Sequence, residues 1–334
     1  MAKISIIGTG TWGIALSILL HQNGHEVSAW SAIQDEITYL RENRMHRSLP
    51  GVKIPEEITW IDADDLRDAC MGKDLLVLAV PSIFTRETCR KMKPYIRDGQ
   101  IIVNVAKGIE EQTLMTLTEQ MEEEIPRADA AVLSGPSHAE EVSRGIPTTC
   151  VAGARTRKTA ELIQNYFMSP VFRVYTSPDV LGIELGGALK NVIALAAGVA
   201  DGLGYGDNTK AALITRGIAE ISRLGMAMGG RAETFSGLSG IGDLIVTCAS
   251  MHSRNRRAGI LIGQGKSMEE AMREVNMVVE GVYSAKAALA LGKKYQVSLP
   301  IIEQVNQVLF EHKSAEEAVA DLMLRDKNME VAWE

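Results

Sequence analysis

Near its start the sequence reads Lys3-Ile4-Ser5-Ile6-Ile7-Gly8-Thr9-Gly10-Thr11-Trp12-Gly13, and an apolar run, Ile14–Leu20, follows directly. This order predicts a short buried strand, a G-x-G-x-x-G turn and a helix. In such a turn Gly8 makes the sharp bend, Gly10 lets the backbone approach a pyrophosphate, and Gly13 lets the helix pack closely on the strand. We therefore expect a dinucleotide site here; the alternative is a glycine-rich turn that binds nothing.

Short apolar runs alternate with helical patterns through the first half of the sequence. Asp74–Pro81 and Gln100–Val105 have the continuous apolar character of strands that are buried on both faces. Further strands are expected over Glu26–Trp30, Ile58–Ile61, Ala130–Leu133, Thr148–Ala152 and Val171–Tyr175, and helices over Asp64–Met71, Ser82–Tyr95, Gln112–Ile125 and Lys158–Phe167. This alternation predicts an α/β fold with a parallel, doubly wound (Rossmann) sheet.

After Ser177-Pro178 the strand-like runs stop and long helical patterns take over. Helices are expected over Val180–Ala200, Thr209–Met228, Met268–Val275, Val282–Tyr295, Ile301–Phe310 and Ser314–Leu324. The sequence thus predicts two domains, a dinucleotide-binding domain over residues 1–177 and an all-α catalytic domain over residues 178–334.

The composition limits the classes of partner and site. The 334 residues are 46% hydrophobic and carry a net charge of −7, which gives no reason to expect nucleic acid as a partner. The four cysteines form no C-x-x-C, so we expect neither a metal site nor a disulfide framework. The most apolar stretch, Ala188–Ala200, is too short for a membrane span and contains Lys190. We expect a cytoplasmic protein without stable membrane insertion.

Ligands of open α/β sheets bind beyond the carboxyl ends of the strands. Lys107 stands at the end of one expected strand, next to a glycine, and is either a surface lysine at a turn or a functional cation in the crevice; its position favours function. Ser134-Gly135-Pro136-Ser137-His138-Ala139 follows the next strand, where Ser137 is placed to cap a short helix and His138 is expected to be exposed.

The helical half contains a lysine in unusual surroundings. Lys190 lies in an apolar helical pattern, Leu185–Leu195, with almost no other charge. Such a lysine either extends to water or is buried with a lowered pKa, and in the second case it is a usable general acid–base. The preceding Gly186-Gly187 indicates a close approach by the cofactor or by the first domain.

A third cluster follows the glycine-rich break Ser236–Gly242. Asp243 opens a helix, where a carboxylate is an ordinary N-cap, and it shares one helix face with Thr247. Arg254 and Asn255, within Ser253–Arg257, are donors suited to a phosphate. The alternative is a solvated basic face, which is the less favoured interpretation on an acidic protein.

Together these motifs closely resemble the bacterial-type NAD(P)-dependent sn-glycerol-3-phosphate dehydrogenases. The resemblance is collinear and runs through Gly8–Gly13, Asn23–Val27, Lys107–Glu110, Ser134–Ala139, Leu189–Asn191, Gly242–Leu244, Thr247-Cys248, Ser253–Asn255 and Val279–Gly281. It implies reversible reduction of dihydroxyacetone phosphate to sn-glycerol 3-phosphate for phospholipid synthesis, with NAD or NADP as cofactor and no metal.

The resemblance also implies roles for single residues. The catalytic residues would be Lys190 as acid–base, Lys107 supporting the substrate oxygen, and Asp243 fixing Lys190. The implied substrate contacts are Lys107, Gly135, Ser137, Lys190, Asn191, Asp243, Thr247, Ser253, Arg254 and Asn255. With the glycine motif, the implied cofactor contacts are Gly8, Gly10, Thr11, Trp12, Gly13, Ser31, Lys107, Ala139, Arg254, Val278 and Glu280.

The residues after the second strand leave the choice of nucleotide open. Trp30-Ser31-Ala32-Ile33-Gln34-Asp35 has no acidic residue at the strand end for a ribose hydroxyl and no arginine for a 2′-phosphate, and Ser31 suits either cofactor. The oligomeric state is equally undecided, with a homodimer as one alternative. Two other functions are weighed on this fold: a related 3-hydroxy acid or hexonate dehydrogenase, and a nucleotide-sensing protein without turnover.

Overall fold

The strand that precedes the glycine-rich turn lies inside an eight-stranded sheet with the order β3-β2-β1-β4-β5-β6-β7-β8. The computed structural model describes residues 1–327 and 329. The strands are β1 Lys3–Ile7, β2 Glu26–Trp30, β3 Thr59–Ile61, β4 Leu75–Leu78, β5 Ile101–Asn104, β6 Asp129–Ser134, β7 Thr148–Ala154 and β8 Phe172–Ser177. The order of the first six strands is that of a Rossmann sheet, which confirms the predicted fold class.

The sheet departs from the expected all-parallel arrangement at one pair. Strand β7 runs antiparallel to β6, and β8 then runs parallel to β7. The connection from β6 to β7 holds only one short helix, α6 (Ala139–Val142), which contacts α1 instead of crossing a face of the sheet. The chain therefore enters β7 at the edge where β6 ends, because a parallel return needs a full crossover.

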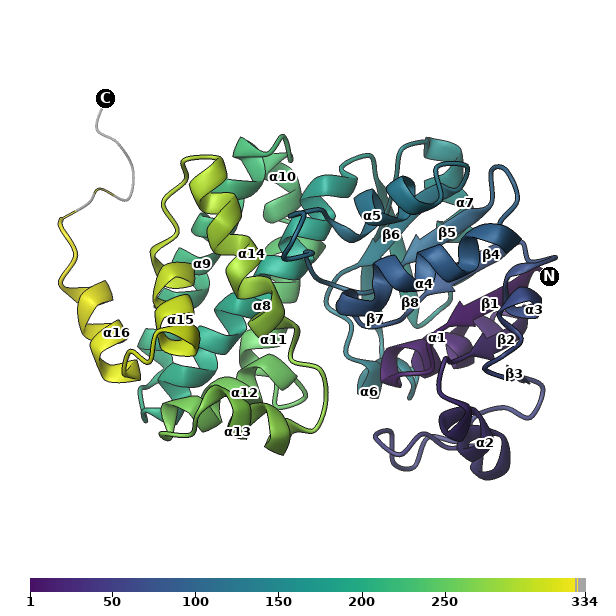
Figure 1. The fold of residues 1–334 in the computed structure, drawn as a ribbon, viewed down its shortest axis with the longest axis horizontal. Coiled ribbons are helices and arrows are strands. Elements are labelled where there is room, and N and C mark those ends of the chain that lie inside the picture. Colours follow the sequence, from purple (N-terminus) through teal and green to yellow (C-terminus); the bar gives the residue numbers. More distant parts are fainter. Residues whose placement is uncertain (328, 330–334) are drawn as a thin grey trace.

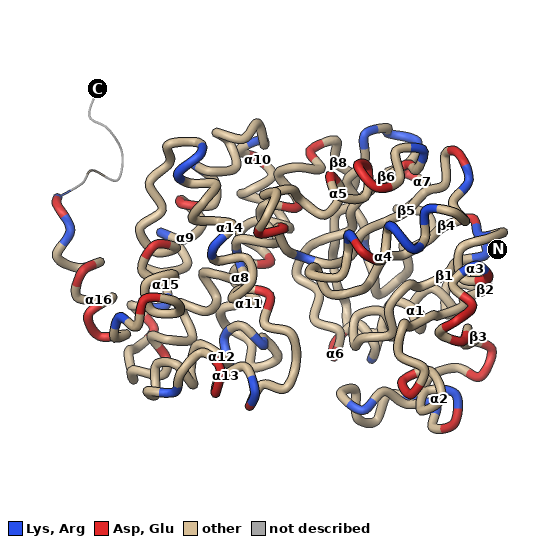
Figure 2. The backbone as a smooth tube through the Cα atoms, in the orientation of Figure 1, with Lys and Arg blue, Asp and Glu red and all other residues tan. Residues whose placement is uncertain are grey.

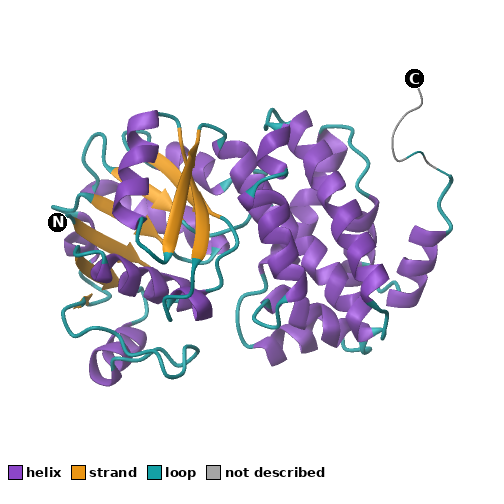
Figure 3. Cartoon of the chain, turned by 180° about the vertical axis from the view of Figure 1, so that it is seen from behind, coloured by secondary structure: helices purple, strands orange, loops and turns teal. Residues whose placement is uncertain are grey.

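Helices cover both faces of the sheet (Figures 1 and 3). They are α1 Thr11–Gln22, α2 Gln34–Asn43, α3 Leu66–Cys70, α4 Thr85–Met92 between the 3₁₀ turns η1 Ser82–Phe84 and η2 Lys93–Tyr95, α5 Leu117–Glu124, α6, and α7 Arg157–Phe167. Helix α2 was not expected. The helix expected from Gln112 begins only at Leu117, where a capping box of Thr116 and Glu119 fixes its start, and its Leu117 and Met121 are buried.

In the part of the second half that the structure describes, all regular secondary structure is helical, as predicted. It comprises α8 Val180–Gly202, α9 Asp207–Ala227, α10 Ala232–Phe235, the π-helical turn η3 Leu238–Gly242, α11 Asp243–Ala249, α12 Arg254–Gly263, α13 Met268–Val275, α14 Glu280–Lys294, α15 Pro300–Phe310 and α16 Ala315–Met323. Helix α8 contacts α9, α11, α12, α14 and α15 and forms the centre of this half (Figure 1). Helix α12 was not expected.

Helix α8 is longer than the apolar stretch seen in the sequence. By length and hydropathy it would suffice to cross a membrane, but 83% of its most apolar window is buried inside the protein. It is therefore the core helix of this half, and its buried face includes Leu185, Leu189 and Val192.

Glycines let α12 pack directly on the backbone of α8. A Cβ added at Gly259 would lie 2.2 Å from the carbonyl oxygen of Leu195 and 2.9 Å from the Cα of Gly198. We expect Gly259→Ala to lower the free energy of unfolding by about 1–3 kcal/mol, because backbone atoms cannot make room as a flexible side chain can. Thermal unfolding measures this change, and an unaltered melting temperature would show that the two helices separate freely.

Candidate active site

The two halves meet at a cleft of about 470 Å³. It lies at the carboxyl ends of β1, β4 and β5, at the point where the strand order reverses. The first half contributes Gly10–Trp12, Glu36, His46, Ser48, Ala79–Pro81, Val105–Lys107 and Ser137–Glu140. The second half contributes Lys190, Asn191, Thr247, Met251–Asn255, Arg257, Met277, Val278 and Glu280.

The three motif glycines have the geometry that the sequence predicts. Gly8 has a φ of +118° and packs on β4, since an added Cβ would lie 2.7 Å from the carbonyl carbon of Ala79. A Cβ at Gly13 would lie 2.1 Å from the carbonyl oxygen of Gly8, which shows how closely α1 sits on the turn. A Cβ at Gly10 would meet nothing within 4 Å, so the backbone is open to the cleft there.

The start of α1 fits a pyrophosphate. Gly10 is its N-cap, no side chain caps its first turn, and the turn carries no acidic residue. The N–H groups at this end of a 12-residue helix therefore keep their positive dipole end for an anion. A dinucleotide would be held by this turn, with Thr11 and Trp12 beside it in the cleft lining.

On the other side of the cleft, one buried carboxylate joins two lysines from different halves. Asp243 Oδ1 accepts from Nζ of Lys190 at 2.6 Å, and its Oδ2 accepts from Nζ of Lys107 at 2.5 Å. Thr247 Oγ1 accepts a second hydrogen bond from Lys190 at 2.5 Å, and the carbonyl of Gly135 accepts one from Lys107 at 2.9 Å. An ammonium group has three N–H donors, so each lysine keeps one for a ligand.

The surroundings of Lys190 tune its proton affinity. Burial lowers the pKa of Lys190 to about 8, although the Asp243 carboxylate opposes this change by favouring the charged form. The pKa of Asp243 is lowered, because the charges of Lys107 and Lys190 outweigh its burial. Asp243 is the first residue of α11 and is not its N-cap, which is Gly242. The alternative that Asp243 is a plain N-cap is therefore wrong, and its carboxylate bridges the two lysines.

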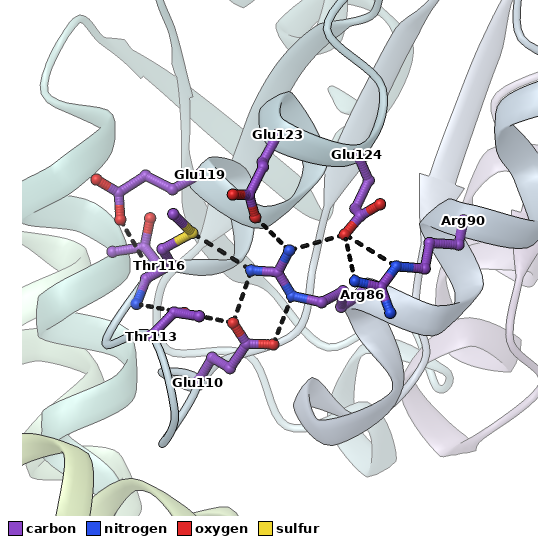
Figure 4. Close-up of polar contacts among 9 residues, drawn as sticks. Arg86, Arg90, Glu110, Thr113, Thr116, Glu119, Glu123 and Glu124 are labelled. Atoms are coloured by element: carbon purple, nitrogen blue, oxygen red, sulfur yellow. Dashed lines mark hydrogen bonds and ion pairs between the residues drawn. The ribbon is translucent and has the colours of Figure 1, made fainter.

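Lys107 packs against α8, and an ion-pair network holds the loop that follows it. A Cβ at Gly187 of α8 would lie 3.0 Å from Ser134 Oγ and 3.4 Å from Lys107 Cγ, as expected for an approach by the first domain. A Cβ at Gly186 would instead lie 2.5 Å from the carbonyl oxygen of Ser239, so the close approach there comes from the second half itself, which was not expected. Figure 4 shows how the loop after Lys107 is held: Glu110 accepts two hydrogen bonds from Arg86, each at 2.7 Å. Arg86 also pairs with Glu123 and Glu124 of α5.

Two further carboxylates of the second half bind backbone and hydroxyl groups of the first. Glu280 accepts from the N–H and the hydroxyl of Ser82 and lies in the cleft lining. Glu184 accepts from the N–H and the hydroxyl of Thr118, and burial raises its pKa to about 7. Burial likewise raises the pKa of Glu280. These contacts hold the two walls of the cleft together.

The basic motif of the second half divides into structural and available groups. Ser253 caps α12 by accepting from the N–H of Arg256. The Asn255 amide is largely committed, because it donates to Asn191 at 2.9 Å and accepts from the N–H of Gly281 at 2.8 Å. Arg254 faces the cleft, and among the described residues no hydrogen bond or ion pair of its guanidinium is found. Of the expected pair Arg254 and Asn255, it is therefore mainly Arg254 that has donors available for a phosphate.

Two expectations about the β6–α6 loop are wrong. His138 is not exposed: it is half-buried in the cleft lining, its Nε2 has no partner among the described residues, and its ring lies 5.8 Å from that of His252. Burial and the nearby Lys190 lower its pKa. Ser137 does not cap α6, since His138 occupies the N-cap position; the Ser137 hydroxyl donates to the carbonyl of Gly135 at 3.0 Å.

The end of β2 also differs from the expectation. Ser31 is buried, and its hydroxyl donates to Glu36 Oε2 at 2.9 Å. Glu36 lies in the cleft lining, so an acidic residue does reach this strand end, from the first turn of the unexpected helix α2.

Of the expected site residues, Gly8, Gly13, Ser31, Gly135 and Asp243 lie behind the cleft wall, and the others line it. The lining residues that the sequence did not indicate include Glu36, His46, Ser48, Glu140, His252, Arg257 and Met277. Arg257 had a signal, because it is one helical turn beyond Arg254 in the basic motif. Among the described residues, no group of three or more His, Cys, Asp or Glu side chains could hold a metal ion.

Comparison with known proteins gives a consistent result over the whole sequence. The family model for the N-terminus of NAD-dependent glycerol-3-phosphate dehydrogenase matches residues 3–160, and the model for its C-terminus matches residues 179–320. Glycerol-3-phosphate dehydrogenases (NAD(P)+) of Agathobacter rectalis and Fusobacterium nucleatum are 66% and 63% identical to this chain. The matches cover 99% of this chain and 98% of the first relative, and 100% of both chains for the second.

A solved structure agrees. The crystal structure of glycerol-3-phosphate dehydrogenase from Coxiella burnetii superposes with a TM-score of 0.93 at 34% identity, covering 97% of this chain and 99% of that chain.

Proposed function

Because this chain belongs to the family of NAD-dependent glycerol-3-phosphate dehydrogenases, we propose that it interconverts dihydroxyacetone phosphate and sn-glycerol 3-phosphate at the cleft between its two halves. The observation that carries the proposal is the Lys107–Asp243–Lys190 bridge, which presents two ammonium groups to one cleft. The product would supply the backbone of phospholipids.

Lys190 is the acid–base of the proposed reaction. Its Nζ is held by Asp243 and Thr247, which leaves one N–H to protonate the oxygen of the ketone as that carbon is reduced. In the reverse direction the neutral amine takes the proton of the hydroxyl. A pKa of about 8 makes both forms accessible near neutral pH.

Lys107 and Asp243 support this proton transfer. Lys107 offers its remaining N–H to the same substrate oxygen, where negative charge develops during reduction. Asp243 holds both ammonium groups in place and compensates their charge. The nicotinamide nucleotide, when bound at the glycine-rich turn, would supply or accept the hydride. No side chain of the protein can do this.

Arg254 binds the substrate phosphate in this proposal. It lies between Ser253 and Asn255 in the sequence, and all three residues line the cleft. Its planar guanidinium suits bidentate contact with a phosphate. We expect Arg254→Ala to raise the KM for dihydroxyacetone phosphate by about 10²-fold or more, with a smaller effect on kcat, because a charge-assisted contact is lost in ground and transition states alike.

Arg254→Lys is the matched variant for this measurement. It keeps the charge but loses the planar fork, so we expect a KM between those of the wild type and the alanine variant. An unchanged KM in Arg254→Ala would place the phosphate elsewhere, with Arg257 as the next candidate in the cleft lining.

The first test of the proposed reaction is oxidation of NADH and of NADPH with dihydroxyacetone phosphate. Turnover that requires this ketone supports the proposal. Nucleotide binding without turnover would support the sensing alternative, and turnover only with a 3-oxo acid would support the 3-hydroxy acid dehydrogenase alternative.

The proposal extends to the organisation and location of the protein. The nucleotide-binding domain would comprise residues 1–177 and the catalytic domain residues 178–334, and the protein would act in the cytoplasm, as a homodimer, without membrane insertion. The burial of α8 supports the last point. Fractionation of cells and light scattering of the purified protein test the location and the oligomeric state; a membrane-bound fraction or a monomer would contradict the respective part.

A further inference from the structure

Glu36 brings a carboxylate to a place that the sequence seemed to leave without one. It lies in the first turn of α2, and its Oε2 accepts hydrogen bonds from the hydroxyls of Ser31 at 2.9 Å and Thr9 at 3.0 Å. Thr9 stands between the first two glycines of the turn after β1, and Ser31 follows β2. The carboxylate is therefore held between the ends of two neighbouring strands.

This carboxylate has capacity left for a ligand. Both hydrogen bonds end on Oε2, and no donor pairs with Oε1 within the part of the chain that the structure describes. Glu36 shares the cleft lining with Gly10, whose backbone is open to the cleft. In doubly wound sheets, an acidic group at the end of the second strand accepts hydrogen bonds from the 2′-hydroxyl of the adenosine ribose.

The arginines near Glu36 are engaged elsewhere. Arg41 pairs with Asp62 at 2.6 Å, Arg44 donates to the carbonyls of Pro55 and Ile58, and Arg47 lies 4.3 Å over the ring of Tyr39. Charges of both signs occupy α2 and the loop after it (Figure 2), yet none of these three arginines lines the cleft.

His46 is the one titratable group of the α2–β3 loop in the cleft lining. Burial lowers its pKa, although the Glu36 carboxylate opposes this change and Arg47 adds to it. At neutral pH the imidazole is therefore mainly uncharged, and it offers no full positive charge to a phosphate group. The full charge that α2 and the loop after it bring to the cleft lining is therefore the negative charge of Glu36.

We propose that Glu36 makes this enzyme select NADH over NADPH. Its carboxylate accepts a hydrogen bond from the ribose 2′-hydroxyl of NADH, whereas the 2′-phosphate of NADPH would meet a fixed negative charge at the same place. This inference rests on the proposed function in one respect, namely that a nicotinamide nucleotide occupies this cleft.

The test is the affinity of the protein for each nucleotide without any ketone present, measured by isothermal titration calorimetry. We expect the wild type to bind NADH at least about tenfold more tightly than NADPH. Glu36→Gln should narrow this ratio at least about tenfold, mainly through tighter binding of NADPH, because the repulsive charge is gone while the side chain keeps its shape. Asp35→Asn removes a neighbouring exposed charge of the same helical turn and should leave the ratio unchanged.

The possible results separate this inference from the proposed function. Equal or tighter binding of NADPH by the wild type would overturn the inference, as would an unchanged ratio in Glu36→Gln; in both cases turnover with dihydroxyacetone phosphate would still support the reaction. If the wild type bound neither nucleotide, the proposed function would fail together with the inference. The ratio of the two affinities in the wild type tests the inference even if no variant folds. Glu36→Ser is a second variant in case Glu36→Gln has a lowered melting temperature.

Discussion

Replacing Lys190 with alanine is expected to lower kcat for reduction of dihydroxyacetone phosphate by about 10³-fold or more, which is the range of a general acid–base. The expected loss is large because Lys190 Nζ is the buried ammonium that the Asp243 bridge aims into the cleft. Binding of NADH should change little, since the glycine-rich turn and α1 lie on the opposite wall. Single-turnover kinetics and nucleotide titration measure the two effects separately.

Lys190→Arg is the matched control for this variant. It keeps a positive charge beside Asp243, but a guanidinium does not release its proton near neutral pH. We therefore expect Lys190→Arg to be nearly as inactive as Lys190→Ala. Near-normal turnover in either variant, with the ketone as substrate, would remove Lys190 from the mechanism.

Replacing Asp243 with asparagine should be almost as damaging, for an electrostatic reason. The Asp243 carboxylate favours the charged form of Lys190, so its removal lowers the pKa of Lys190 further below its wild-type value of about 8. Lys190 must be protonated to act as the acid in ketone reduction. The rate of reduction should therefore fall with rising pH in the wild type near pH 8, and at a lower pH in Asp243→Asn.

The expected fall in kcat of Asp243→Asn follows from the loss of the Lys107–Asp243–Lys190 bridge. We expect kcat of Asp243→Asn to fall by about 10²–10³-fold at pH 7, because the amide keeps only one of the two acceptor oxygens that Lys107 and Lys190 use and no longer compensates their charge. A purely structural role of Asp243 would reduce the amount of folded enzyme without moving the midpoint of the pH profile. The midpoint is thus the deciding measurement, and an unshifted midpoint would contradict the electrostatic role.

Stability must be followed in the same variant. Removing one member of a buried ion pair costs about 3–5 kcal/mol when the remaining charge stays buried. Lys190 need not stay charged, because it can lose its proton and remain as a neutral amine. This limits the loss in the free energy of unfolding. The free energy of unfolding of Asp243→Asn can be compared with that of Glu184→Gln. Glu184 is also a buried carboxylate at the contact of the two halves, but it does not line the cleft.

The features that depend on local sequence pattern could be predicted without the structure. The strand, the turn Gly8–Gly13 and the helix behind it follow from residues that are adjacent in the chain, so period and glycine spacing suffice. The apolar helix around Lys190 is equally local, because a single lysine among buried apolar residues stands out in any helical pattern. The change from strands to helices after Ser177 is a third feature of this kind.

Contacts between residues that lie far apart in the sequence became known from the folded arrangement. By its local pattern Asp243 is an ordinary helix-start residue, and the resemblance implied only that it fixes Lys190; that it also binds Lys107 becomes visible when α11 packs on α8. Glu36 is separated from the end of β2 by a turn, so no strand-end pattern could indicate it. His138 seemed exposed because the second half, which covers it, lies far away in the sequence.

The physical reason for this division is the range of the interactions. Backbone conformation and hydrophobic periodicity are set by neighbours in the chain, and they fix β1, α1 and α8. The direction of β7, the bridge of Lys107 to Asp243, and the carboxylate between Thr9 and Ser31 depend on hydrogen bonds and charges between segments that only folding brings within about 3 Å.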